Sequence, residues 1–250
     1  YFRQLDFYYN YTRAWNADGL IFDHSVGPEV FARFKNYWWV DAGGSLNFRH
    51  LDDLDTRGGP PIVKPANRLG YVNVSTDTRK SWNVFFHVDS RRDTEGGWAQ
   101  SFGPTLKVKP SNRLQASIAA NYTTARDVAQ WIKNEDLDAD GVEENIYGRL
   151  RRNVVNVTGR ATYAFSPNRT LEAYLQPFVA VGDYTDIRKL ARANSFDFDP
   201  VVISNDPDFS DKSLRGTIVM RWEYLRGSTL FVVWNLGTSD DSRPGAFSPW

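Results

Sequence analysis

The chain has 250 residues, enough for one large domain or two small ones. Thirty basic and thirty acidic residues cancel, so no net electrostatic field favours nucleic acid as a partner. Cysteine is absent, which excludes disulfides, thiolate metal sites and cysteine nucleophiles.

The chain is rich in aromatic residues and yet polar overall. Aromatic residues make up 15% of it, while the mean hydropathy is −0.51. This combination is typical of a membrane β-barrel with aromatic girdles and a wet interior, and a carbohydrate-binding β-sandwich shares it. No apolar run approaches the ~18 residues of a transmembrane helix, and the opening residues indicate that a signal peptide is absent or already removed.

Period-two alternation of apolar and polar residues predicts about eleven β-strands. In chain order they cover residues 4–11, 30–34, 38–48, 69–75, 82–89, 101–108, 114–123, 155–163, 171–181, 217–224 and 230–235. Polar segments rich in Gly, Pro, Asp and Asn predict loops over residues 15–27, 51–67, 91–97, 126–147 and 185–212.

The predicted turns fall into two kinds. Those near residues 77–80, 110–113, 166–169 and 225–228 are short, whereas most of the connections between them are long and polar. Outer-membrane barrels have short turns at one end and long loops at the other, and their tilted strands need ~9–11 residues to cross the bilayer. The pattern therefore favours an all-β, antiparallel transmembrane β-barrel of the outer-membrane type.

The orientation of the apolar faces decides between a barrel and a soluble sandwich. In the hairpin of residues 217–235, one face is apolar and the other carries Arg221 and Glu223. In a barrel the apolar face, with Trp222, Leu175 and Ile118, contacts lipid and the polar face lines the lumen. In a sandwich these three side chains meet in the core.

Eleven strands is an odd number, whereas bacterial single-chain barrels have even numbers. The last residues, 248–250, are predicted to lie in a loop. We therefore expect residues 1–250 to form a single outer-membrane β-barrel domain that is incomplete in this chain and is the C-terminal part of a longer protein.

Four groups of residues together resemble a known family. They are Arg57–Pro60 with Pro65, Ser75–Lys80, Leu175–Val179 with Gly182 and Tyr184, and Arg221–Tyr224 with Gly227–Leu230. In this order they resemble the C-terminal barrel region, a domain of unknown function, of bacterial outer-membrane proteins that carry an N-terminal carbohydrate-binding-module-like domain. The resemblance implies an outer-membrane location and no established activity. The chain departs from the pattern because it lacks the N-terminal binding domain and a terminal membrane strand.

A predicted acidic loop contains a candidate calcium site. Asp136, Asp138 and Asp140 alternate before Gly141, as at the start of a calcium-binding loop, and Glu144 follows at the ninth position. The twelfth position, which needs a bidentate Glu, is Tyr147. A solvated acidic loop without metal is the alternative, and no other cofactor is expected.

Four charged residues on polar faces form a candidate lumen charge network: Arg160, Glu172, Arg221 and Glu223. In a barrel they point inward, where pairing of Arg with carboxylates offsets their desolvation. They form either a constriction that selects solutes or a structural ladder.

Two further features leave other functions open. His87 and Asp89 share a face, and a carboxylate beside a histidine can orient a general base. No serine lies in a nucleophile-elbow context, so we expect no enzyme. Trp15, Trp98 and Trp131 near strand ends or in loops suit sugar stacking, although an interfacial girdle explains them equally.

The sequence thus predicts a conduit or membrane anchor in the outer membrane of a Gram-negative-type bacterium, with a role in glycan or polymer uptake. Its expected partners are the lipid bilayer with lipopolysaccharide, a small solute or glycan in the lumen, and a partner protein or N-terminal binding domain. The alternatives are a soluble, aromatic-rich β-sandwich that binds carbohydrate, and a barrel-borne hydrolase.

Overall fold

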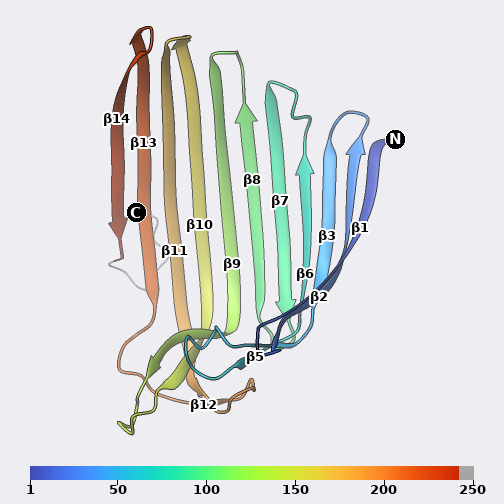
Figure 1. The fold of residues 1–250 in the computed structure, drawn as a ribbon, viewed down its shortest axis with the longest axis vertical. Helices are drawn as coiled ribbons and strands as arrows, with labels where there is room; N and C mark the ends of the chain where they lie inside the picture. Colours follow the sequence, from blue (N-terminus) through green and yellow to red (C-terminus); the bar gives the residue numbers. More distant parts are fainter. Residues whose placement is uncertain (242–250) are drawn as a thin grey trace.

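The computed structural model describes residues 1–241, which form an antiparallel all-β fold (Figure 1). Eleven strands lie side by side in the main sheet, in this order: β1 (Phe2–Trp15), β2 (Ile21–Phe34), β3 (Trp39–Asn47), β6 (Asn67–Ser75), β7 (Trp82–Asp93), β8 (Trp98–Val108), β9 (Leu114–Glu135), β10 (Glu144–Ser166), β11 (Arg169–Leu190), β13 (Phe209–Leu225) and β14 (Ser228–Asp240). The short strand β12 (Phe198–Pro200) pairs with β11, and β4 (His50–Asp52) pairs with β5 (Ile62–Lys64) in a separate hairpin. Within residues 1–241 no helix is long and apolar enough to cross a membrane.

The four predicted short turns are present in the structure, and all of them lie at one end of the sheet, at the top of Figure 1. At the other end, residues 16–20 and 94–97 are short turns rather than the predicted longer loops, because the flanking strands extend further than their alternation indicates. The segments between β3 and β6 and between β11 and β13 are longer, as predicted, although they contain the short strands β4, β5 and β12.

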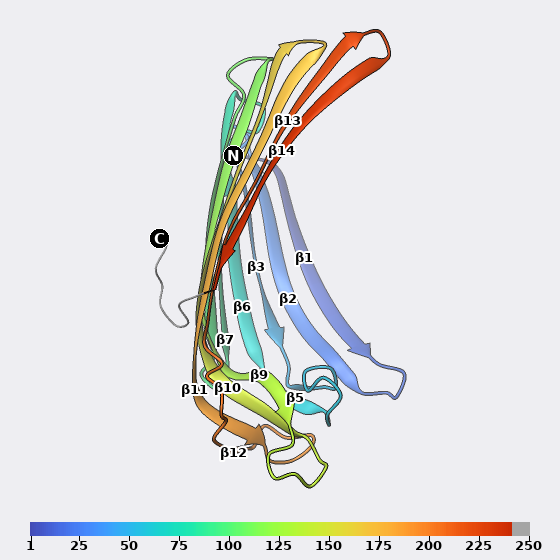
Figure 2. The same cartoon turned by 90° about the vertical axis from the view of Figure 1, so that its left-hand side faces the viewer.

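The predicted loop over residues 126–147 is wrong for most of its length. Strands β9 and β10 contain 22 and 23 residues and leave only residues 136–143 between them. The register shifts between Ile146 and Tyr147 and again between Gly148 and Leu150. Such bulges bend a strand and interrupt its alternation, which explains why the sequence pattern fails here. Figure 2 shows these strand ends curling over the lower end of the sheet.

The two faces of the main sheet differ in character, and we call them the apolar face and the polar face. On the apolar face the register aligns residues of successive strands into rows; one row runs through Val84, Leu106, Ile118, Gly159 and Leu175. Ile118 is 52% exposed and Leu175 47% exposed. Within residues 1–241 no second layer of strands covers this face, so Ile118, Leu175 and Trp222 do not meet in a core.

The sheet is bent into a trough (Figure 2). Strand β5 lies on its concave side, where residues of the β4–β5 hairpin share a cavity with Arg91, Asp127 and Arg152 of the polar face. The polar face is therefore concave and the apolar face convex. Within residues 1–241 the sheet does not close into a barrel, because β1 and β14 do not pair with each other and each has a single neighbouring strand. The prediction of an incomplete barrel is therefore confirmed only as far as an antiparallel all-β sheet. The predicted terminal loop, residues 248–250, lies outside the described residues.

The buried core lies at the long-loop end. Its side chains include Ile62 of β5, Ala125 of β9, and Ile146, Tyr147 and Leu150 of β10, each at most 4% exposed. Asp55 accepts from the Tyr147 hydroxyl and Gly59 lies against the Asn145 side chain, so segment 53–61 packs against β10, which is distant in sequence, and covers the lower part of the trough. We call β4, β5 and segment 53–61 the cap.

A small polar cluster fixes the short-turn end. Asn83 of β7 is 7% exposed, and its Nδ2 donates to Ser75 Oγ at 3.0 Å and to the carbonyl oxygen of Thr76 at 2.9 Å. Thr76 Oγ1 in turn accepts from the backbone N–H of Val84 at 2.9 Å. The side-chain amide of Asn83 therefore provides hydrogen bonds to buried oxygen atoms of the turn between β6 and β7.

We predict that Asn83→Leu destabilises the protein by about 1–3 kcal/mol, because it leaves buried acceptors without a donor. The exposed turn residue Asn112, for which Asn112→Leu is the control, should tolerate the change within about 0.5 kcal/mol. Denaturant unfolding of the folded protein measures both values. Equal stabilities of the two variants would show that the Asn83 cluster is dispensable.

Candidate functional site on the polar face

A chamber of about 390 Å³ lies between the cap and the polar face at the long-loop end. Its lining includes three cationic and three acidic side chains: Lys64, Arg91, Arg152, Asp52, Asp93 and Asp127. Because the charges balance, the chamber suits a solute rich in hydrogen-bonding groups better than a strongly charged one.

Asp127 of β9 is the centre of this chamber. Its Oδ1 lies 3.2 Å from a terminal nitrogen of Arg91, and its Oδ2 lies 3.4 Å from Nε of Arg152. The three residues belong to β7, β9 and β10, and the Asp127 side chain is 17% exposed. Two guanidinium groups around one carboxylate offset the cost of its desolvation and hold the three strands in one arrangement.

The sequence pattern missed these three residues as a site. Arg91 and Asp127 fall in segments predicted as loops, and nothing local links them to Arg152. One feature of the sequence does point to them: Arg91–Arg92 and Arg151–Arg152 are consecutive pairs. Because successive side chains of a strand lie on opposite faces, each pair places one arginine on each face of the sheet.

The predicted lumen residues share the polar face but do not form one network. Arg221 and Glu223 pair at 3.4 Å within β13. Arg160 instead lies over the ring of Tyr174, 5.2 Å from its centroid, and Glu172 stands between Thr162 and Val219 in the register. No ion pair between Arg160 and Glu172 occurs among the described residues, so the arrangement resembles a ladder more than a constriction.

His87 and Asp89 do come together. His87 Nε2 lies 3.0 Å from Asp89 Oδ1, and its Nδ1 lies 2.6 Å from Asn73 Oδ1. Because Asn73 Nδ2 donates to Asp41 at 3.1 Å, its Oδ1 is the atom that accepts from His87. Both ring nitrogens thus have protein partners and neither is available to a substrate as a general base. This geometry suits a structural link across β3, β6 and β7.

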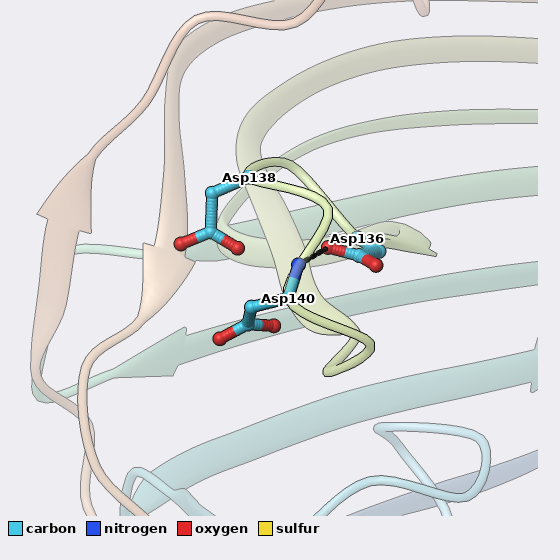
Figure 3. Close-up of side chains that lie close together, drawn as sticks. All are labelled: Asp136, Asp138 and Asp140. Atoms are coloured by element: carbon cyan, nitrogen blue, oxygen red, sulfur yellow. Dashed lines mark hydrogen bonds between the residues drawn. The ribbon is translucent and has the colours of Figure 1, made fainter.

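The three aspartates of the predicted calcium loop lie close together at the exposed tip between β9 and β10 (Figure 3). One carboxylate oxygen of each residue lies within 4.8 Å of the others. Asp136 already accepts from the backbone N–H groups of Asp140 and Gly141, at 3.2 and 2.9 Å.

Glu144 is not part of that group. Its Oε1 contacts Lys189 Nζ at 2.9 Å and its Oε2 accepts from the N–H of Leu137 at 3.1 Å. The hydrogen bond from Lys189 lowers the pKa of Glu144 below its usual value. Glu144 therefore fastens the loop to β11, and the calcium hypothesis is left with three exposed carboxylates.

Three carboxylates on an exposed loop predict weak calcium binding, with a dissociation constant on the order of 10⁻⁴–10⁻³ M. Isothermal titration should show that Asp138→Asn with Asp140→Asn abolishes this binding. Glu144→Gln, the control, should leave it unchanged. Equal heats from the protein and the double variant would refute the site.

Comparison with other proteins adds a family but no activity. A search of curated proteins gives no match to the chain. Residues 2–245, nearly the whole chain, match a family described as a domain of unknown function. The chain thus belongs to the DUF5916 family.

Proposed function

We propose that the chain is the β-barrel part of an outer-membrane protein, with its apolar face against lipid and its polar face around an aqueous interior. Membership of the family neither supports nor opposes this proposal, because the family is a domain of unknown function. The proposal rests on the two faces of the sheet and on the position of the cap.

The observation that carries the proposal is the continuous exposed apolar face. Its rows cross nearly the whole sheet; one row passes through residues 7, 30, 42, 72, 88, 102, 122, 155 and 179, all of them apolar or aromatic. The largest apolar patch of a typical soluble monomer covers about 300–600 Å². A band of about 26 Å along the strands and about 38 Å across nine of them covers roughly 1,000 Å². Contact with lipid avoids the free-energy cost of exposing such an apolar face to water.

The dimensions of this face fit a bilayer. From Leu114 to Tyr122 on β9 the apolar positions extend for about 26 Å along the strand, close to the ~25 Å apolar band of outer-membrane barrels. Exposed aromatic side chains flank the band at both ends, as in the aromatic girdles of such barrels. At the short-turn end they include Trp38, Trp82, Phe165 and Tyr224; at the other end, Tyr11, Trp15 and Phe48.

The two edges of the sheet also support a membrane barrel that is completed by additional strands. Strands β1 and β14 each present one row of unpaired backbone groups. Within lipid such groups must be paired, because no water is present to satisfy them. We therefore propose that further strands, which this chain does not contribute within residues 1–241, close the barrel.

The chamber, whose positive and negative charges balance, and the polar trough both favour the role of a conduit. The chamber suits a hydroxyl-rich solute such as a glycan, in keeping with a role in glycan or polymer uptake. The cap favours the second candidate, a plugged membrane anchor, because it is tied to β10. Asp55 of the cap contacts Lys64 at 2.8 Å and accepts from the Tyr147 hydroxyl at 3.1 Å.

We predict that Ile118→Arg destabilises the lipid-embedded protein by about 2–4 kcal/mol, since the arginine would sit in hydrocarbon. Thr158→Arg, on the polar face, is the control and should cost much less. Unfolding in lipid vesicles measures both. If the protein is instead a soluble sandwich or sheet, Ile118 is simply a surface residue, both variants stay within about 0.5 kcal/mol, and the protein needs no detergent.

We predict stepwise ion currents in planar bilayers that increase in Asp55→Ala, because this change breaks the contact with Lys64 inside the cap and the hydrogen bond from Tyr147 that ties the cap to β10. Asp53→Ala removes the same charge from the same segment but breaks only the contact with Asn16, at 2.7 Å, and should leave the currents unchanged. Silence from the protein and from both variants would contradict the conduit and favour the anchor.

A further inference from the structure

We propose that four arginines in one row on the apolar face, Arg68, Arg92, Arg126 and Arg151, bind the phosphate groups of an anionic membrane lipid. We call them the arginine row. This inference rests on the proposed function, because it assigns a lipid class to the face that the membrane is proposed to cover.

The register places the row along a single line across five neighbouring strands. Arg68 of β6 stands opposite Arg92 of β7, which stands opposite Trp98 of β8. Trp98 pairs with Arg126 of β9, and Arg126 pairs with Arg151 of β10. With about 4.8 Å between strands, the row spans roughly 19 Å, wide enough to meet more than one lipid headgroup.

The arginine row has no carboxylate partner within residues 1–241, whereas Arg91 and Arg152 of the polar face do. Arg91 and Arg152, the chain neighbours of Arg92 and Arg151, both contact Asp127. In the described part of the chain, by contrast, no ion pair or side-chain hydrogen bond involves any guanidinium of the arginine row. Asp183 stands opposite Arg151 in the register without pairing with it.

The position of the row matches the boundary of a lipid layer. Between it and the apolar band lies one row of small or polar residues: Gly70, Ser90, Gln100, Thr124 and Asn153. The next row contains Val72, Val88, Phe102 and Tyr122, all exposed. The arginine row therefore lies four residues along each strand beyond the last apolar row, at the depth where headgroups replace acyl chains.

A groove beside the row has the matching amphipathic chemistry. Its volume is about 760 Å³, and it is lined by Leu46, Phe48 and Trp98 together with Arg68 and Arg92. Asp93 also lines it, and its Oδ1 accepts from the backbone N–H groups of Glu95 and Gly97. Aromatic and aliphatic groups can hold the start of an acyl chain, while guanidinium groups recognise phosphate in bidentate geometry. A free phosphate would use only the charged half of this groove, so we assign the row to lipid.

The test compares two double variants that lose the same charge from opposite faces. Arg92→Gln with Arg126→Gln removes the centre of the row, and Arg160→Gln with Arg215→Gln is the polar-face control. Each protein, folded in a zwitterionic detergent, is titrated with phosphorylated lipid A and with lipid A stripped of phosphate, and native mass spectrometry measures the bound lipid.

We expect the row variant to bind phosphorylated lipid A at least about tenfold more weakly than the unchanged protein, since each arginine near an anionic surface contributes roughly a fivefold factor. The control should bind normally, and lipid without phosphate should bind weakly to all three proteins.

Three results would overturn the inference alone, with the protein still folded in detergent. They are equal affinities of the row variant and the unchanged protein, equal binding of lipid with and without phosphate, and displacement of the lipid by inorganic phosphate at comparable concentration. A change of oligomeric state in the row variant without loss of lipid would assign the row to a contact between copies. A protein that is soluble without detergent would overturn the proposed function as well.

Discussion

The alternation of side chains along each strand is the constraint on which the rest of the structure depends. Because the antiparallel register keeps this alternation in phase across eleven strands, most apolar positions join one face and most charged positions join the other. A slip of one residue in any strand would place charges in the apolar rows. The two faces thus form the amphipathic surface that a single-layered sheet needs if it is to lie between lipid and water.

Charged side chains have different surroundings on the two faces of the sheet. On the polar face, Arg91 of β7, Arg152 of β10 and Arg221 of β13 lie against carboxylates, so ion pairs between nearby side chains line the trough. On the apolar face, the four arginines of the arginine row have no carboxylate partner within residues 1–241. Since desolvating an unpaired guanidinium is costly, this row is stable only where water or anionic groups reach it.

The cap gives the trough a second structural element at the long-loop end. Tyr147 is fully buried, and its hydroxyl donates to Asp55, a residue more than ninety positions away in the chain. The same region holds the core, the chamber around Asp127 and the ends of the longest strands. The contacts that hold the cap and the lining of the chamber therefore lie in one region of the sheet.

The sequence by itself determined the all-β class, the strands and their faces, and the four short turns, because period-two alternation and turn residues are local properties. The resemblance and the family agree on a domain of unknown function, and the membrane assignment stays a prediction. Only the tertiary structure decided that β9 and β10 continue through the predicted acidic loop, that segment 53–61 folds back into the trough, and that Arg91, Asp127 and Arg152 meet. It also separated Glu144 from the three aspartates and left Arg160 and Glu172 unpaired. These outcomes depend on bulges, strand curvature and contacts between residues far apart in the chain, and no local pattern encodes them.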